Sequence, residues 1–345
     1  LPEKFWKDHN LSEPLSTPPL ASGPYRISDW KMGQYIVYQR EKDYWGADLP
    51  VNRGRWNFDT LRYDYYLDDN VAFEAFKAGA YDVRTESSAK NWATRYIGKN
   101  FASGYIVKDE QKNNAAQDTR WLAFNIQRPV FHDRRVRQAV SMAFDFEWMN
   151  KALFYGAYSR ANSYFQNTEY AARDYPHADE LVLLAPMKAE LPPEVFTRLF
   201  EPPKSDGNGF DRDNLLKASN LLDDAGWVLK NRQRVNAQTG KPLSFELLIA
   251  SGANDQWVLP FKKNLARLGV TMNIRQVDIA QLTNRKRSRD YDMMQTLWAA
   301  QPWPSSDLQI SWASGYIDSS YNAPGVKSPV IDALIAKIVA AQGDK

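Results

Sequence analysis

One segment in the second half of the chain restricts the possible folds more than any other. Leu243–Ala250 is an apolar run of strand length, and Asp255–Gly269 carries apolar residues at the i, i+3, i+4 spacing of an amphipathic helix that ends at a glycine. Val270, Met272 and Ile274 then alternate with polar residues, as in a second strand. Strand, helix and strand in this order form a βαβ unit, so we predict an α/β fold in which helices cover a sheet.

The same periodicities predict elements elsewhere in the chain. Predicted strands are Tyr35–Tyr38, Leu61–Leu67 and Tyr291–Thr296, and a short apolar run occupies Leu122–Ile126. Predicted helices are Val71–Ala78, followed by Gly79 at the C-cap, then Asp133–Phe146 with Asp133 as N-cap, and Asp213–Gly226. The Pro-containing segment Tyr164–Gly209 has no regular pattern, so we expect it to wrap over the surface with short helical turns.

Length and composition exclude several classes of protein. The 345 residues are enough for two domains, and a second unit is predicted to start near Trp121. The absence of cysteine excludes disulfides and thiolate sites. The net charge of +3 is spread over 44 basic and 41 acidic residues, which argues against a nucleic-acid partner. No apolar run approaches the ~20 residues that span a bilayer, and Leu1–Asn10 lacks a signal-peptide pattern, as in a processed secreted protein.

Patterns that indicate catalysis or metal binding are missing from the sequence. The three histidines have neither metal-ligand spacing nor an obvious nucleophile partner, and no G-x-S-x-G, P-loop or G-x-G-x-x-G motif occurs. The acidic pairs Asp68-Asp69 and Asp223-Asp224 are neighbours in the chain, so their carboxylates do not face one substrate. We therefore predict a protein that is not an enzyme and uses no cofactor. A hydrolase would need two carboxylates that converge across a cleft.

The segment Leu297–Asp307 combines aromatic, amide and proline side chains. It reads Leu-Trp-Ala-Ala-Gln-Pro-Trp-Pro-Ser-Ser-Asp and follows the predicted strand Tyr291–Thr296. Proline fixes φ, so a loop that contains two prolines should be stiff. If Trp298 and Trp303 are held rigidly after a strand, their rings would line one side of a ligand-binding site. Composition alone leaves a second interpretation open, in which these rings pack at the edge of a domain and have no ligand.

Several motifs occur in the order in which one family of binding proteins carries them. They are Gly23-Pro-Tyr25, Tyr44-Trp45-Gly46, Phe73–Gly79 with Asp82, Phe124-Asn125 before Phe131, Asp133–Ala139, Leu221–Trp227, Asn322 with Gly325, and Pro329–Asp332. Through them the chain resembles the periplasmic oligopeptide, dipeptide and nickel-binding proteins of ABC importers, solute-binding protein family 5. Within that family, the Trp-rich loop and the Arg-rich tract 285–289 are most similar to the binding component of the enterobacterial importer for microcin C and other peptides.

The resemblance implies a bilobal α/β periplasmic-binding-protein fold of type II, cluster C, which encloses its ligand between two lobes. It also implies an incomplete chain. Residues 1–120 would form part of the first lobe, and residues 121–345 most of the C-terminal ligand-binding lobe, without the return crossover. The implied protein is a periplasmic monomer that captures short peptides, including formylated ones such as microcin C, and delivers them to an ABC importer permease in the inner membrane. The alternative is a protein of the same fold that binds an oligosaccharide or a metal chelate, because aromatic side chains can also stack on sugar rings.

The resemblance places ligand contacts at Trp298 and Gln301, with Trp303 close by. In oligopeptide binders of the family, an Asp three residues after the Trp pairs with the peptide's ammonium terminus, whereas this chain has Gln301 there. A neutral amide donates and accepts hydrogen bonds but forms no ion pair. We therefore expect the protein to bind peptides with blocked N-termini, such as a formylated one, or to bind the peptide's ammonium group through other residues.

Four further residues are weaker candidates for ligand contact. Asn125 and Tyr155 are two of them, although Asn125 would also suit a structural turn and Tyr155 a core ring. Lys286 and Arg287 are candidates for binding a peptide carboxylate or a nucleotide phosphate. Their basic tract would also suit a solvated helix face.

Overall fold

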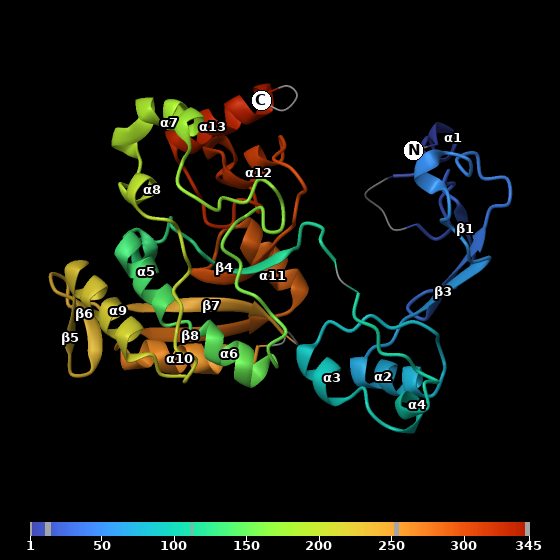
Figure 1. The fold of residues 1–345 in the computed structure, drawn as a ribbon, viewed down its shortest axis with the longest axis horizontal. Helices are drawn as coiled ribbons and strands as arrows, with labels where there is room; N and C mark the ends of the chain where they lie inside the picture. The colour runs from blue at the N-terminus through green and yellow to red at the C-terminus, as the bar shows by residue number, and fades with distance from the viewer. Residues whose placement is uncertain (1, 11–14, 112, 252–254, 342–345) are drawn as a thin grey trace. The chain divides into compact units, whose positions relative to one another are not determined.

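The computed structural model describes residues 2–10, 15–111, 113–251 and 255–341. The chain forms two compact units. Unit 1 comprises Leu1–Glu86 and Ile97–Val107, and unit 2 comprises Ser87–Tyr96 and Lys108–Lys345. Figure 1 traces both units from blue at the N-terminus to red at the C-terminus. The division into lobes at residues 120 and 121 stays a prediction.

Unit 1 is built on a three-stranded antiparallel sheet in the order β1-β2-β3. Its strands are β1 (Tyr25–Lys31), β2 (Tyr35–Arg40) and β3 (Thr60–Asp64), and its short helices are α1 (Glu3–Trp6), η1 (Pro50–Asn52) and α4 (Lys99–Ala102). The predicted strand Tyr35–Tyr38 is confirmed, whereas the predicted strand Leu61–Leu67 ends three residues early, at Asp64. Many rings on this unit remain exposed, Tyr63 and Tyr65 among them, so the sheet buries little apolar surface.

Helix α2 (Asp69–Lys77) supplies the small core of unit 1. Asp68 caps it, since one carboxylate oxygen accepts hydrogen bonds from the backbone N–H groups of Asn70 and Val71. Gly79 follows the helix with φ +79°, a conformation that a residue without Cβ adopts readily. Phe73 on the buried face is only 1% exposed. The predicted helix and its glycine end are therefore confirmed.

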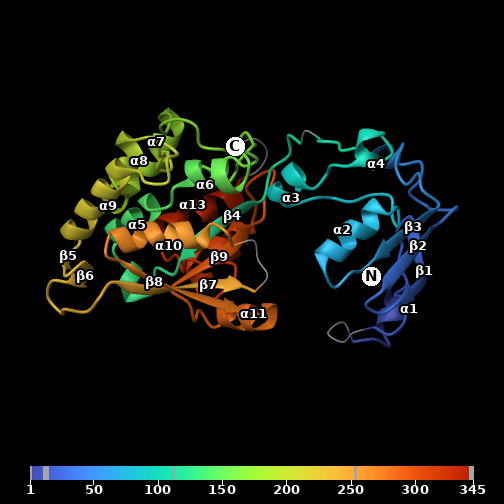
Figure 2. The same ribbon diagram turned by 90° about the horizontal axis from the view of Figure 1, so that it is seen from below.

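Unit 2 contains a four-stranded sheet in the order β4-β9-β7-β8. Strands β7 (Ser244–Ala250), β8 (Thr271–Val277) and β9 (Met293–Trp298) are parallel, and β4 (Thr119–Phe124) pairs antiparallel with β9. Helix α10 (Val258–Arg267) connects β7 to β8, which confirms the predicted βαβ unit. Both views show α10 on one side of the sheet and α11 (Ile279–Arg287) on the other (Figures 1 and 2).

The core of unit 2 lies where the sheet meets its helices. Phe245 and Leu247 of β7, Phe261 and Leu265 of α10, and Met293 of β9 are each at most 2% exposed and belong to one apolar cluster. Alternate strand residues and every third or fourth helix residue provide these side chains, as the periodicity requires.

The helix predicted over residues 133–146 ends four residues early, at Met142, and a second helix begins at Phe146. Helix α5 (Arg134–Met142) begins at Asp133, whose carboxylate accepts a hydrogen bond from the Arg135 N–H at 2.8 Å. Asp145 then caps α6 (Phe146–Leu153), accepting from the Trp148 N–H at 3.0 Å. A capping aspartate offers the backbone an alternative to continuing the helix, which explains the break.

The remaining elements of unit 2 are short apart from α9 and α13. They are α3 (Ala89–Thr94), η2 (Pro129–Phe131), α7 (Ala178–Leu184), η3 (Ala185–Glu190), α8 (Glu194–Thr197), α9 (Arg212–Asp224), β5 (Trp227–Lys230), β6 (Gln233–Asn236), α12 (Leu308–Trp312), η4 (Ser314–Tyr316) and α13 (Pro329–Ala340). The segment Tyr164–Gly209 holds only short helices, as expected. Among the described helices, none combines the length and apolar character needed to cross a membrane.

The β5–β6 hairpin was not predicted. Its two turn residues, Asn231 and Arg232, have φ of +49° and +65°, which is the backbone of a tight hairpin turn. Arg234 on β6 is 2% exposed and donates hydrogen bonds to the Leu268 and Trp227 carbonyls and to the Asp223 carboxylate. This buried guanidinium therefore joins the hairpin to the helices beside it.

Candidate ligand-binding site

The loop that follows β9, residues 299–307, lies at the carboxyl end of the parallel strands. We call it the β9 loop. In open α/β sheets, ligands bind at the edge where parallel strands end, because the connecting loops gather there. Trp298, the last residue of β9, pairs with Thr119 of β4, and the Ala300 N–H donates to the Asp118 carboxylate at 2.7 Å. The start of the loop is thus anchored to the neighbouring strand.

Four aromatic rings form a cluster at the carboxyl end of β9, where the β9 loop begins. Tyr164 stacks on Trp121 with ring centroids 4.5 Å apart, and its edge meets Trp312 at 4.7 Å and Trp298 at 5.4 Å. Trp298 also donates from Nε1 to the Tyr164 carbonyl at 2.8 Å. Although 42% of the Tyr164 surface stays accessible, burial of the phenol in this cluster raises its pKa to about 12. Trp298 is therefore held in one orientation by neighbours on both sides.

Gln301 is fixed by two partners within the β9 loop. Its Nε2 donates to Asp307 Oδ2 at 3.2 Å, and its Oε1 accepts from the Ser305 hydroxyl at 2.9 Å. An ionised carboxylate only accepts hydrogen bonds, so the amide nitrogen must face Asp307 and the amide oxygen must face Ser305. Among the described residues the amide has no further partner, so one N–H and one lone pair remain for a ligand. Trp303, in the same loop, is 61% exposed.

Asn125, Lys286 and Arg287 lie at the opposite end of β9. Asn125 follows β4, which runs antiparallel to β9, and Lys286 and Arg287 end α11, which precedes β9. A six-residue strand separates this end from Trp298, a span of roughly 17 Å. The structure therefore does not bring these three residues together with the β9 loop.

Asn125 is buried and fully engaged. It is 1% exposed, donates from Nδ2 to the Tyr291 and Arg289 carbonyls at 3.0 and 3.3 Å, and accepts from the Gln127 N–H at 3.2 Å. These bonds match the structural turn considered from the sequence. A role of Asn125 in ligand contact stays a prediction.

The basic tract is mostly occupied by contacts within unit 2. Arg285 pairs with Glu246 and Asp290, and Arg289 donates to backbone carbonyls that include that of Asn322. Lys286 is half-buried with its Nζ 5.9 Å from the Tyr321 ring centroid, and burial lowers the pKa of its ammonium group. Arg287 is exposed. Lys286 and Arg287 therefore stay the candidates of the tract for an anionic ligand group.

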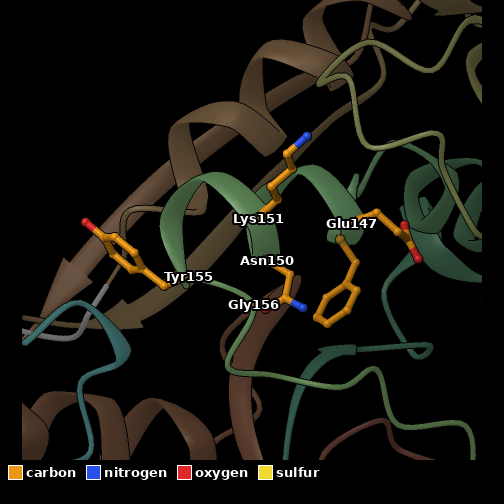
Figure 3. Close-up of a pocket in the computed structure, with 6 residues that line it drawn as sticks. Glu147, Asn150, Lys151, Tyr155 and Gly156 are labelled. Atoms are coloured by element: carbon orange, nitrogen blue, oxygen red, sulfur yellow. The ribbon is translucent and has the colours of Figure 1, made fainter. Parts of the chain in front are cut away.

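Tyr155 borders an open pocket of about 470 Å³ beside α6. The pocket is lined by Phe146, Glu147, Asn150, Lys151, Tyr155 and Gly156. Figure 3 shows the Tyr155 ring and the Glu147 carboxylate at opposite ends of it. Tyr155 is 50% exposed with φ +55°, so it is not the core ring considered from the sequence. Asn150 stabilises the turn that contains Tyr155, because its side chain forms hydrogen bonds with both the backbone N–H and the backbone C=O of Tyr158.

Two of the acidic residues considered for catalysis have structural contacts. Asp68 caps α2, and Asp223 pairs with Arg234. Within the described ranges, no three His, Cys, Asp or Glu side chains are grouped as metal ligands would be. The geometry thus offers a wall of fixed rings and one oriented amide for binding.

Sequence reasoning missed three residues of this site. Ser305 and Asp307 fix the Gln301 amide, and Tyr164 locks Trp298. Ser305 and Asp307 stand in the loop singled out from the sequence, four and six residues after Gln301, which is the only signal for them. Tyr164 begins the irregular segment and carries no signal.

Two curated relatives cover nearly the whole chain. YejA of Escherichia coli K12 is 74% identical over 344 residues, which is 100% of this chain and 57% of that protein. A protein of Agrobacterium fabrum described as probable peptide-binding protein YejA is 37% identical over 352 residues, covering 99% of this chain and 57% of the relative. The chain therefore spans little more than half the length of the curated relatives it matches.

Solved structures share the fold at low sequence identity. NikA of Brucella suis, in complex with Fe(III)-EDTA, has a TM-score of 0.64 at 21% identity and covers 94% of this chain and 57% of its own. The oligopeptide-binding protein AppA of Bacillus subtilis, in complex with a nonapeptide, has a TM-score of 0.62 at 20% identity, with coverages of 93% and 55%. The predicted α/β fold is confirmed, and the chain is partial relative to these structures.

A family model matches most of the sequence. It is described as bacterial extracellular solute-binding proteins, family 5, middle part, and it matches residues 2–320. This match and the two relatives confirm the family indicated by the motifs from Gly23 to Asp332. The chain belongs to family 5 of the bacterial extracellular solute-binding proteins.

Proposed function

We propose that the protein of which this chain is part captures short peptides outside the cytoplasm and delivers them, as a monomer, to the permease of an ABC importer in the inner membrane. The observation that carries the proposal is the fixed amide of Gln301. Its free N–H and free lone pair match the C=O and N–H of a peptide group, which is common to all peptides. The description of the Agrobacterium relative and the nonapeptide bound by AppA support the same ligand class.

Capture without turnover follows from what the β9 loop offers. Trp298 and Trp303 provide apolar surface, and Gln301 provides hydrogen bonds to the peptide backbone. None of these groups is a nucleophile or an acid–base pair. Specificity for side chains would be low, since main-chain hydrogen bonds do not read side chains and water adapts to varied pockets. Closure around a hinge would complete the enclosure of the peptide.

Peptides with blocked N-termini fall within the proposed ligand class. A neutral amide at position 301 imposes no requirement for a charged terminus. Formylated peptides such as microcin C are therefore proposed ligands. Tyr155 at the rim of its pocket is a proposed further contact.

A metal chelate is the second candidate ligand, because NikA is bound to Fe(III)-EDTA. An oligosaccharide is the third, since the exposed face of Trp303 would also suit a sugar ring. Both would use the same fold but need different polar partners. A chelate would need cationic or histidine groups beside the rings, and a sugar would need several acceptors.

Native mass spectrometry of the full-length protein as purified tests the proposal directly. We expect a series of bound masses that denaturation releases as peptides of mixed sequence. A released sugar, a metal complex or a protein that binds no added peptide would contradict the proposal.

A matched pair of variants links binding to the β9 loop. Trp303→Ala should weaken binding of an added tetrapeptide about tenfold, since a buried ring contact contributes on the order of 1–2 kcal/mol. Phe200→Ala is the control, because Phe200 is a similarly exposed ring (71%) outside the loop. Equal affinities of the two variants would place the site elsewhere.

A further inference from the structure

The loop that precedes α9 contains the one Asn-Gly pair of the sequence, Asn208-Gly209. Asn208 is exposed to solvent. Gly209 has no Cβ to hinder the approach of its backbone nitrogen to the Asn208 side chain, and its φ of +78° is one that glycine adopts readily. An asparagine side chain and the next backbone nitrogen can close a five-membered ring with loss of ammonia, which makes asparagine chemically labile. The pair therefore has the composition of a deamidation site.

Hydrogen bonds distinguish this pair from Asp206-Gly207, which precedes it and can close the same kind of ring. The Gly207 N–H donates to Ser205 Oγ at 3.1 Å, so the nitrogen that would attack Asp206 is engaged. The Gly209 N–H has no acceptor among the described residues. The structure thus leaves the attacking nitrogen free at position 209 and occupied at position 207.

Asp206 orients the side-chain amide of Asn208. One Asp206 oxygen accepts from the Asn208 backbone N–H and the other from Asn208 Nδ2, each at 3.0 Å. Because a carboxylate only accepts hydrogen bonds, the amide nitrogen must face Asp206. That nitrogen leaves as ammonia and gains positive charge when it is protonated. A carboxylate beside it stabilises that charge.

We propose that Asn208 is a modification site, which deamidates spontaneously in the folded protein to aspartate and isoaspartate. The Gly209 nitrogen forms a bond to Asn208 Cγ and gives its proton to solvent, while the bond from Cγ to Nδ2 breaks and ammonia leaves. Water then adds to either carbonyl of the resulting succinimide and opens the ring. The net reaction consumes one water and releases one ammonia, with no oxidant or reductant.

Both products disturb the contacts of this loop with the helices beside it. Aspartate at position 208 replaces the donor of Asp206 by a second negative charge. Isoaspartate lengthens the backbone by one methylene before Gly209, where space is short, because a Cβ on Gly209 would lie 3.0 Å from Trp148 Nε1 of α6. The Gly209 carbonyl also accepts from Arg267 of α10 at 3.3 Å. Deamidation should therefore loosen the attachment of the loop to α6 and α10.

Peptide mapping by mass spectrometry tests the assignment on the full-length protein. The folded protein is incubated at neutral and at mildly alkaline pH, and samples are digested at intervals. The mass shift of deamidation is then located in the sequence, and chromatography separates the aspartate from the isoaspartate peptide. The variants are wild type, Asn208→Gln and the control Asn284→Gln, which replaces an exposed asparagine on α11.

In wild type and Asn284→Gln, we expect Asn208 to lose its amide before any other asparagine and before Asp206 isomerises. The loss should be faster at alkaline pH, because the attacking backbone nitrogen must give up its proton. Asn208→Gln should show no early mass shift at position 208, since glutamine must close a larger ring.

Two results would overturn the proposal. One is an intact Asn208 in folded protein whose other asparagines convert. The other is conversion of Asn208 only after the protein has been unfolded in urea, because the fold would then protect this residue.

Discussion

Replacing Asn125 by alanine tests whether this residue holds the fold or contacts ligand. The amide donates to the Tyr291 and Arg289 carbonyls and accepts from the Gln127 N–H, and only 1% of the residue is exposed. Truncation to alanine therefore leaves these three backbone groups without their protein partner in a buried site. Three hydrogen bonds at about 1 kcal/mol each give an expected loss of about 3 kcal/mol in the free energy of unfolding.

Urea unfolding followed by tryptophan fluorescence measures this loss, since most tryptophans lie in unit 2. With a slope of about 3 kcal/mol per molar urea, the midpoint of Asn125→Ala should fall by about 1 M while the slope stays unchanged. Asn284→Ala is the control, because Asn284 is exposed on α11. A midpoint within about 0.2 M of wild type would refute the reasoning.

The isosteric change Asn125→Asp adds a dependence on pH. The introduced carboxyl faces two backbone carbonyls in a buried site, so its pKa in the folded state should rise above the unfolded value. A raised folded pKa means that stability is retained at acidic pH and lost as pH rises through that pKa. Asn125→Asp should therefore be closer to wild type at pH 4 than at pH 7. The same loss at both pH values would contradict the buried placement.

Three further predictions concern other parts of unit 2. Arg234→Met should lower the free energy of unfolding by about 3 kcal/mol in urea titrations, because it leaves buried carbonyls without their donor. The pKa of Lys286 should lie below that of an exposed lysine in an NMR titration of the ¹³C-methylated amine, and Tyr321→Ala should bring it back towards the ordinary value by admitting water. Trp298→Phe removes the hydrogen bond to the Tyr164 carbonyl and should lower the free energy of unfolding by about 1 kcal/mol. The near-UV circular dichroism spectrum should also change, and an unchanged spectrum would contradict the ring cluster.

Local patterns were sufficient to predict the centre of unit 2. Strand β7, helix α10 and strand β8 follow each other in the chain, so each element and their parallel pairing can be derived from periodicity and connection rules. Helix ends were also predictable where a capping residue marks them, as Asp133 does. The break at Asp145 was missed because apolar spacing continues across it, and only its capping contact reveals the second helix.

Contacts between distant segments could not be predicted from one sequence. The β9 loop was identified by its composition and by the family resemblance, but the packing of Trp298 against Tyr164 joins residues 134 positions apart. The hydrogen bonds of Gln301 depend on the path of the loop. The two prolines restrict the backbone φ at their own positions, but they do not determine that path. Asn125 was a weaker candidate for ligand contact than Trp298, and the antiparallel pairing of β4 with β9 places the two residues at opposite ends of this strand pair.

The pairing of β4 with β9 also sets a time order for folding during synthesis. Strand β4 ends at Phe124, and its one partner among the described strands of the sheet begins at Met293. A ribosome adding ~5–20 residues per second needs on the order of 10–30 s to make the intervening chain. During that interval the unpaired edge and the Trp121 side chain have no native partner strand, which favours association with other chains. A chaperone that shields nascent residues 119–124 would therefore be expected to raise the yield of folded protein.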